Sequence, residues 1–85
     1  MNISKEELEE IKKYPLNKRI RMIRISLCLS QREFAERMNL ASNSVSIWES
    51  GKRKPKLETM YKIIRTFDLP MDLFNDIIRE RIDAE

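Results

Sequence analysis

The sequence predicts an all-α fold in one compact domain, and three observations lead to that prediction. No segment alternates apolar and polar residues with the period of a strand, and no Asn-Gly or Asp-Gly pair signals a hairpin. Apolar residues instead recur at helical spacing, and two Ser-x-x-Glu capping boxes mark helix starts. At 85 residues, the chain has room for one small domain.

The first two helices are expected at residues 5–13 and 17–28. Ser4 and Glu7 form the capping box that opens the first helix, and Pro15 ends it because proline cannot continue a helix. The second helix carries apolar residues at i, i+3 and i+7. This stripe predicts that the second helix lies against the core.

Two short helices are expected next, at residues 31–38 and 42–49. The second capping box begins at Ser30 and opens the first of them. Asn39 begins a three-residue turn, since asparagine is among the few non-glycine residues that tolerate the left-handed conformation. Gly51, the only glycine, follows the second helix, where a helix end favours positive φ.

The last two helices are expected at residues 57–67 and from Pro70 to about residue 82. Pro70 suits a first helical turn, where the N–H that proline lacks would have no partner in any case. The chain should therefore form a five-helix domain preceded by an extra N-terminal helix.

The composition excludes several function classes. The chain has no histidine, one cysteine and one glycine. It therefore lacks the commonest general base, an internal disulfide, a plausible zinc cluster and a glycine-rich phosphate loop. We expect no enzyme, no metal, no cofactor and no small-molecule substrate. No apolar run reaches the roughly 20 residues of a membrane span, and no signal peptide opens the chain, so we expect a cytoplasmic protein that binds no membrane.

The charges are unevenly distributed along the chain. Residues 17–56 carry ten basic and three acidic side chains, a net charge of +7, whereas residues 1–16 sum to −1 and residues 57–85 to −3. A positive segment between two acidic flanks favours a polyanionic partner. From charge alone, a solvated charged face is an equal alternative.

The two short helices and their turn lie inside the basic segment and form a helix-turn-helix arrangement. Four apolar residues should lock the crossing of the two helices: Met38, Leu40, Val45 and Trp48. The full pattern is Leu29-Ser30-Gln31-x-x-Phe34-Ala35-x-x-Met38-x-Leu40, followed by Val45-x-x-Trp48-Glu49-x-Gly51-Lys52-Arg53-Lys54-Pro55. It resembles the lambda-repressor-like family of helix-turn-helix domains, the Cro and phage-repressor class, from about Arg21 to Phe74. The resemblance implies an N-terminal helical extension at 1–16, a DNA-binding domain at 17–78 with its motif at 31–50, and a C-terminal helix end at 79–85.

The exposed face of the second motif helix is expected to enter the major groove of double-stranded DNA. The resemblance implies that the residues at the matching positions read bases, and these are Ser42, Asn43, Ser46 and Ile47. Asparagine can bond an adenine bidentately, serine can bond several base edges, and isoleucine can cover a thymine methyl. Ordinary solvent-facing side chains are the alternative at all four positions.

Phosphate contacts are expected from other residues, namely Gln31, Ser44, Lys52, Arg53 and Lys54. Gln31 lies at a helix N-terminus, where free backbone N–H groups and the helix dipole favour an anion. The resemblance implies that this glutamine clamps the DNA backbone. Free solvated charges are the alternative for the three basic residues of the loop. Phosphate contacts would fix the register of the protein on DNA without reading its sequence.

Other positions around the motif carry structural expectations. The resemblance implies a partly buried salt bridge between Arg24 and Glu49, so that Arg24 is structural. Cys28 stands where the family usually has glycine, and a left-handed cysteine would cost about 1–2 kcal/mol. We therefore expect the helix to end differently, with Cys28 as a small half-buried hydrophobic residue. Ala41 replaces the usual N-cap Ser or Thr, which loses about 1 kcal/mol unless Ser42 caps instead.

The last helix carries more apolar surface than one side of a small domain easily buries. This predicts a two-fold dimer through Leu73, Phe74, Ile77 and Ile78, with core packing as the alternative. We therefore expect a bacterial or phage transcription regulator, a repressor that binds a palindromic operator as a homodimer. The second hypothesis is an antitoxin-like or adaptor protein whose main role is to bind a protein partner.

Overall fold

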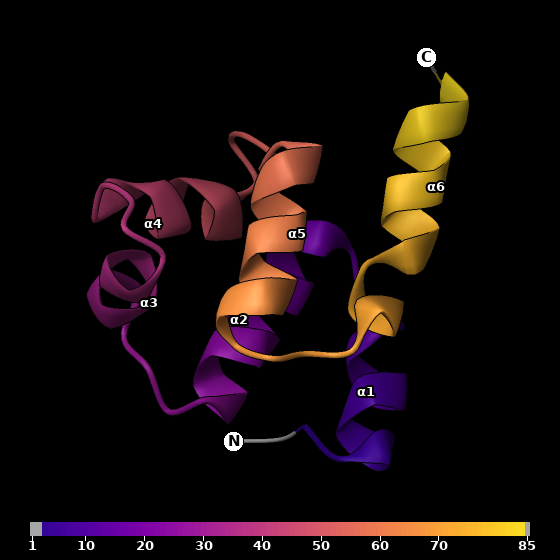
Figure 1. Ribbon diagram of the computed structural model, residues 1–85, viewed down its shortest axis with the longest axis horizontal. Coiled ribbons are helices and arrows are strands. Elements are labelled where there is room, and N and C mark those ends of the chain that lie inside the picture. Colours follow the sequence, from indigo (N-terminus) through magenta and orange to yellow (C-terminus); the bar gives the residue numbers. More distant parts are fainter. Residues whose placement is uncertain (1–2, 85) are drawn as a thin grey trace.

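The computed structural model describes residues 3–84, and helices make up all the regular secondary structure in that range. In chain order they are α1 (Lys5–Ile11), α2 (Leu16–Ser26), α3 (Gln31–Arg37), α4 (Asn43–Ser50), α5 (Leu57–Thr66), the 3₁₀ turn η1 (Met71–Leu73) and α6 (Asn75–Ala84) (Figure 1). The predicted all-α fold is confirmed. Residues 1–2 and 85, at the outer ends of the expected segments 1–16 and 79–85, lie outside the described residues.

Both predicted capping boxes are present. The hydroxyl of Ser4 accepts the N–H of Glu7 at 3.1 Å, and the Glu7 carboxylate accepts the N–H of Ser4 at 3.3 Å. Ser30 and Glu33 make the same two bonds at 3.0 and 2.9 Å. These bonds satisfy N–H groups that the helix leaves free, so α1 and α3 begin where the sequence predicts. The α1 helix is shorter than expected and ends at Ile11.

The C-terminal helix differs from the prediction. Pro70 opens only a single 3₁₀ turn, η1, and α6 begins at Asn75. Phe74 has a φ of −128° between the two elements, which interrupts the helix there. Leu73 and Phe74, at this interruption, are both fully buried. The break therefore serves the packing of two successive apolar side chains into the core.

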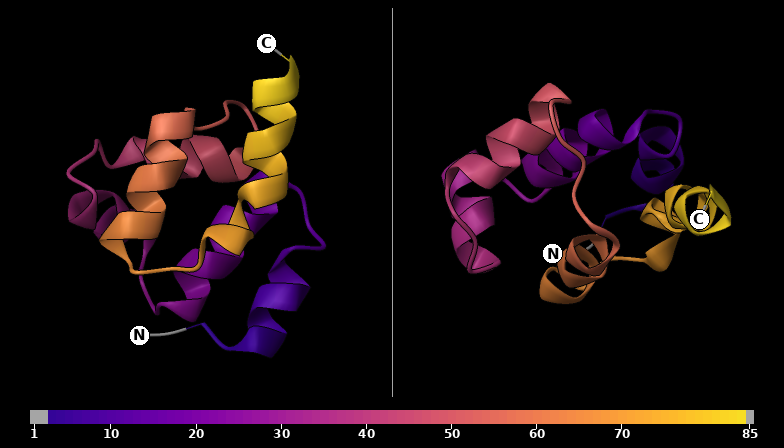
Figure 2. Two further views of the ribbon diagram at one scale, coloured as in Figure 1. Left: turned by 45° about the vertical axis from the view of Figure 1, so that its right-hand side comes forward. Right: turned by 90° about the horizontal axis from the view of Figure 1, so that it is seen from above.

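Helices α2 and α5 lie at the centre of the molecule, with α3 and α4 on one side and α1 and α6 on the other (Figures 1 and 2). Fully buried side chains from the central helices form the core, including Ile20 and Ile23 of α2 and Ile63 of α5. The ring of Phe34 on α3 packs against that of Phe67, with 4.6 Å between ring centroids. The core thus joins the helix-turn-helix side of the molecule to its centre.

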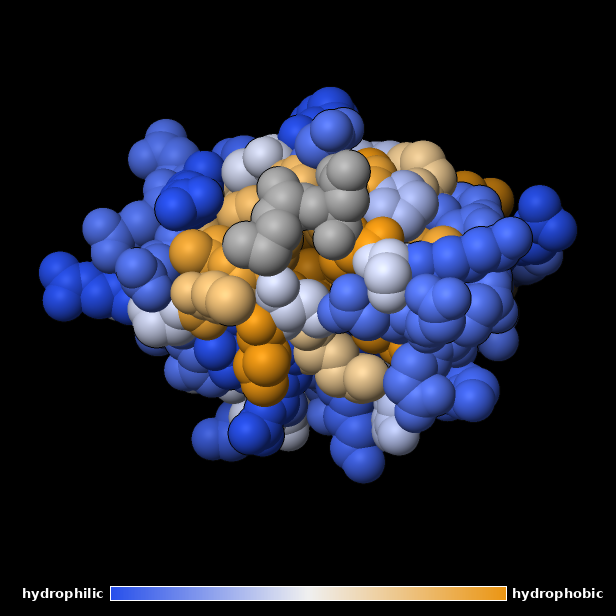
Figure 3. Space-filling view, turned by 90° about the horizontal axis from the view of Figure 1, so that it is seen from below, coloured by the Kyte–Doolittle hydropathy of each residue, from blue (hydrophilic) through white to orange (hydrophobic). Residues whose placement is uncertain are grey.

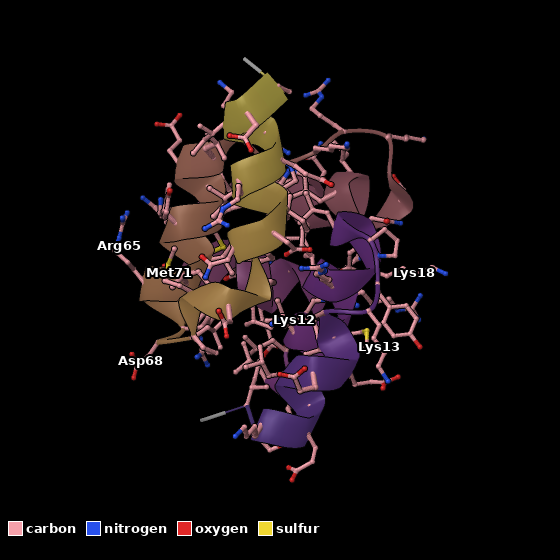
Figure 4. All side chains as sticks on the ribbon, turned by 90° about the vertical axis from the view of Figure 1, so that its right-hand side faces the viewer. Lys12, Lys13, Lys18, Arg65, Asp68 and Met71 are labelled. Carbon is pink, nitrogen blue, oxygen red and sulfur yellow. The ribbon has the colours of Figure 1, made fainter. Side chains whose placement is uncertain are left out.

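Arg19 of α2 joins both ends of the chain to the central helix. Its side chain is nearly buried, and it donates to the backbone carbonyls of Tyr14 at 2.6 Å, Lys12 at 2.9 Å and Leu73 at 2.9 Å. It also makes two 2.7 Å hydrogen bonds to the carboxylate of Asp76 on α6. Figure 4 looks onto this junction, where Lys12 lies just below the start of α6. The N-terminal extension therefore packs onto the domain beside the last helix.

Most residues expected at a dimer interface belong to the core instead. Leu73, Phe74 and Ile78 are buried within this chain, and Ile77 is half-buried against the same cluster. A side chain packed inside one chain is unavailable to a second copy, so the expected interface is corrected at these three residues. They are buried because η1 packs against both α1 and α6. The C-terminal segment therefore has more packing partners within the chain than the sequence suggests.

Some apolar residues reach the surface of the molecule. The face seen from below shows several hydrophobic residues near its middle and hydrophilic ones toward its edge (Figure 3). Among the described residues, the large apolar side chains that are exposed are Ile25, Met71 and Ile82.

The longest described helix, α2, has 11 residues, whereas a bilayer span needs about 20, so no described helix can cross a membrane.

Candidate nucleic-acid interface

The turn between α3 and α4 is closed by backbone hydrogen bonds around a left-handed residue. Asn39 has a φ of +57°, as the sequence predicts. The N–H of Leu40 then donates to the carbonyl of Ala35 at 2.9 Å, and that of Asn39 to the carbonyl of Glu36 at 3.0 Å. This arrangement satisfies carbonyls at the end of α3 and turns the chain toward α4.

The apolar residues expected to lock the two motif helices lie in the core. Met38 and Val45 are fully buried, Trp48 is buried, and Leu40 is half-buried against the same cluster. Helix α4 packs against both α3 and α2. The orientation of α4 is therefore fixed by packing along the face opposite to its exposed residues.

Helix α4 begins without a side-chain cap. Its N-cap residue, Ser42, has helical dihedral angles of −60° and −27° and makes no capping hydrogen bond. The carbonyl of Ala41 accepts the N–H of Ser44 at 3.0 Å, so the first turn is tightened by a backbone bond. Ser42 thus does not take over the capping role that Ala41 lacks, and its hydroxyl remains exposed.

The four expected base-reading residues share one face of α4. Ser42 and Asn43 are exposed in its first turn, and Ser46 and Ile47 follow one turn later, half-buried. The hydroxyl of Ser46 donates to the backbone carbonyl of Asn43 at 3.1 Å, so only its acceptor lone pairs are free for another partner. Asn43 is therefore the side chain of this face with the most unused hydrogen-bonding capacity.

A carboxylate at the end of α4 joins three helices. Glu49 accepts hydrogen bonds from Arg24 on α2 at 2.6 and 3.0 Å and from the amide of Gln31 on α3 at 3.1 Å. The side chains of Arg24 and Glu49 are only 14% and 7% exposed. The hydrogen bonds that Arg24 donates to Glu49 raise the pKa of Arg24. Arg24 also donates to the carbonyl of Leu29 at 2.9 Å, and Asn17 donates to that of Glu49 at 3.4 Å.

Gln31 is expected to clamp a phosphate, and the structure gives its side chain a second role that sequence reasoning misses. Its amide nitrogen donates to Glu49, which leaves one amide N–H and the side-chain oxygen for other partners. Ser44 is half-buried in the first turn of α4. Gln31 and Ser44 thus lie in the first turns of α3 and α4, and the left-handed turn joins the opposite end of α3 to the start of α4.

The basic loop follows directly after α4. Gly51 ends the helix with a φ of +82°, as predicted, and donates its N–H to the Trp48 carbonyl at 3.1 Å. Lys52, Arg53 and Lys54 are then exposed. Within the positive segment 17–56, Arg19 and Arg24 are each paired with a carboxylate inside the fold. The three basic residues of the loop instead carry their positive charge at the surface.

Cys28 ends α2 in the left-handed conformation, with a φ of +60°. The N–H of Cys28 donates to the Ile25 carbonyl at 2.9 Å, and that of Leu29 to the Arg24 carbonyl at 3.2 Å. These bonds close the helix in the way that glycine usually allows, so the expectation of a different ending is wrong. The cysteine is also exposed, so the expectation of a half-buried hydrophobic residue is wrong as well.

Arg19 is a further polar side chain whose role no local sequence pattern predicts. Its partner Asp76 lies 57 residues further along the chain, and its other acceptors are backbone carbonyls. No local pattern points to such a pair. A basic residue at the expected start of an amphipathic helix is an ordinary surface residue until the tertiary fold is known.

The sequence profile of the helix-turn-helix family matches residues 20–74, which span the motif and the helices around it. The chain belongs to the lambda-repressor-like helix-turn-helix family. The chain is also similar to a curated relative, the HTH-type transcriptional activator BcrR of Enterococcus faecalis, to which it is 30% identical over 56 residues. The matched region covers 66% of this chain and 28% of BcrR. No solved structure matches the chain.

Family membership and the relative together support a DNA-binding transcription regulator. The chain spans less than a third of the length of the relative that it matches, 28%. Helix-turn-helix regulators are not typically enzymes, which agrees with the residue types of this chain.

Proposed function

We propose that the protein binds double-stranded DNA sequence-specifically, with α4 in the major groove, and regulates transcription from an operator. One observation carries this proposal. Ser42 and Asn43 stand exposed in the first turn of a helix whose far end is held by the hydrogen bonds of Glu49 to α2 and α3. Exposed polar side chains on a rigidly placed helix are what base readout requires.

The chemistry of each side chain determines whether it is assigned to base contacts or to phosphate contacts. Asn43 suits bidentate bonding to adenine, Ser42 and Ser46 can bond base edges, and Ile47 can contact a thymine methyl. The phosphate contacts fall to Gln31, Ser44, Lys52, Arg53 and Lys54, which lie in the first turns of α3 and α4 and in the basic loop after α4. Base contacts would specify the sequence, and phosphate contacts would fix the register.

A homodimer on a palindromic operator remains part of the proposal, with a narrower interface than the sequence predicts. On α6, Ile82 is exposed and Ile77 half-buried, so these two side chains are the large apolar ones left for a second copy. A two-fold dimer would place its half-sites about 34 Å apart. Occupying an operator represses a promoter that overlaps it, so repression is the proposed outcome.

Selection from a random duplex pool at about 150 mM salt, followed by sequencing, tests the proposal directly. An enriched palindrome supports a dimeric operator-binding protein, and an enriched single half-site supports a monomer. No enrichment, together with affinity that vanishes as salt rises, would move the function to the binding of a protein partner.

Two variants separate base readout from phosphate binding. Asn43→Ala is expected to weaken operator binding by about 1–3 kcal/mol and to leave non-specific DNA binding unchanged. Lys52→Ala should weaken both and reduce the salt slope by about 1, because one phosphate contact is lost. Lys5→Ala, on α1 at the far side of the molecule from α3 and α4, is the control for charge removal (Figure 1). Equal losses on both kinds of DNA would remove Asn43 from base readout.

A further inference from the structure

The C-terminal helix holds the base of the basic loop. Lys52, Arg53 and Lys54 are exposed, whereas the next residue, Pro55, is buried. The guanidinium of Arg81 on α6 donates a 2.6 Å hydrogen bond to the backbone carbonyl of Pro55. The two residues are 26 positions apart, so the contact ties the end of the chain to the segment that follows α4.

The loop and α6 also share a groove. Lys54 lines this groove from the loop, and Ile77, Glu80 and Arg81 line it from α6. At its other end, the loop begins at Gly51, which is fixed to α4 by its hydrogen bond to Trp48. The three basic residues therefore lie between two anchors, one on α4 and one on α6.

We propose that Arg81 is a positioning residue for DNA binding, which fixes the loop so that its basic side chains meet the DNA backbone. This inference rests on the proposed function. A loop with three long side chains loses conformational freedom when it binds, and a loop held beforehand loses less of it. Arg81 acts through the backbone of Pro55, so its effect falls on phosphate contacts and leaves the choice of base sequence unchanged.

Two arginines of α6 provide a matched comparison. Arg81→Ala is expected to weaken binding to every duplex sequence about three- to tenfold and to lower the salt slope. Arg79→Ala removes the same charge from an exposed position on the same helix and should have a much smaller effect. Fluorescence anisotropy with operator and random duplexes, at several salt concentrations, measures both. The pair Arg81→Gln and Arg79→Gln replaces them if circular dichroism shows that alanine unfolds α6.

A double-mutant cycle with Lys54→Ala separates positioning from direct contact. If Arg81 acts through the loop, the combined loss in Arg81→Ala with Lys54→Ala is smaller than the sum of the single losses. Additive losses, or equal losses for the two arginine variants, would overturn the proposal while DNA binding itself stands. Absence of DNA binding in the unmodified protein would instead reject the proposed function.

Discussion

Cys28 occupies a backbone conformation that its side chain opposes. With a φ of +60°, its Cβ lies close to the following carbonyl oxygen, which costs roughly 1–2 kcal/mol in an L-residue. The same turn brings the N–H of Leu29 to the Arg24 carbonyl at 3.2 Å, the bond that closes α2. The residue is exposed, so neither packing nor a buried thiol accounts for it.

Replacing Cys28 by glycine should relieve this strain. Cys28→Gly is expected to raise the free energy of unfolding by about 1 kcal/mol, less than the full strain because glycine also adds entropy to the unfolded chain. Urea denaturation under reducing conditions measures the change. Cys28→Ala keeps the Cβ and should show no such gain. An equal gain in both variants would assign the effect to the thiol and not to the backbone.

Three helix boundaries were predictable because their cause lies within a few residues. Ser30, Asn39 and Gly51 act on the backbone beside them, so the sequence predicts the start of α3, the turn after it and the end of α4. The bond from Arg19 to Asp76 joins residues 57 apart, and no local pattern selects that partner. The amphipathic pattern of the last helix likewise shows which residues are apolar, but not whether they pack inside the chain or against a second copy.

Parts of the proposed interface were equally predictable from local signals. The exposed face of α4 follows from helical spacing once its buried residues, Val45 and Trp48, are recognised. The hydrogen bond from Gln31 to Glu49 was not predictable, because its geometry depends on how α3 and α4 cross. The contact of Arg81 with Pro55 depends in the same way on where α6 lies.

At the scale of elements, Glu49 links α4 to both α2 and α3 through its side-chain hydrogen bonds, in addition to the apolar packing of α4. Glu49→Ala should lower the free energy of unfolding by about 3–5 kcal/mol, because it leaves the nearly buried guanidinium of Arg24 without its partner. Chemical denaturation measures the loss. Glu36→Ala removes an exposed carboxylate that pairs with Arg32 at 3.3 Å, and its effect should be below about 1 kcal/mol. Similar effects of the two changes would contradict the role given to Glu49.

At the scale of the whole molecule, the carboxylates set how stability depends on pH. The pKa values of Glu7 and Glu33 are lowered chiefly by backbone hydrogen bonds from their capping serines, and that of Asp76 by the hydrogen bond from Arg19. Each carboxyl binds protons more weakly in the folded chain than in the unfolded one. Each therefore contributes stability above its unfolded pKa that is lost as the pH falls through its folded pKa.

The midpoint of thermal unfolding should accordingly stay level near neutral pH and fall below about pH 4. The chain has no histidine, the side chain that usually titrates between about pH 5 and 8. Asp76→Asn should flatten the acid decline, whereas Asp83→Asn on the same helix provides a charge-matched comparison. Calorimetry between pH 2.5 and 8 measures the profiles, and a midpoint that rises on acidification would refute this account.

The bonds of Arg19 also determine how the molecule comes apart. One guanidinium hydrogen-bonds the segment after α1, the end of η1 and the start of α6, so the loss of either terminal helix removes part of what fixes that guanidinium for the other. The two ends of the chain should therefore open as a single cooperative unit. Helix α6 also carries Arg81, which holds the base of the basic loop through Pro55. A protease or a partner that displaces α1, and α6 with it, would therefore make the basic loop on the opposite side of the fold more mobile.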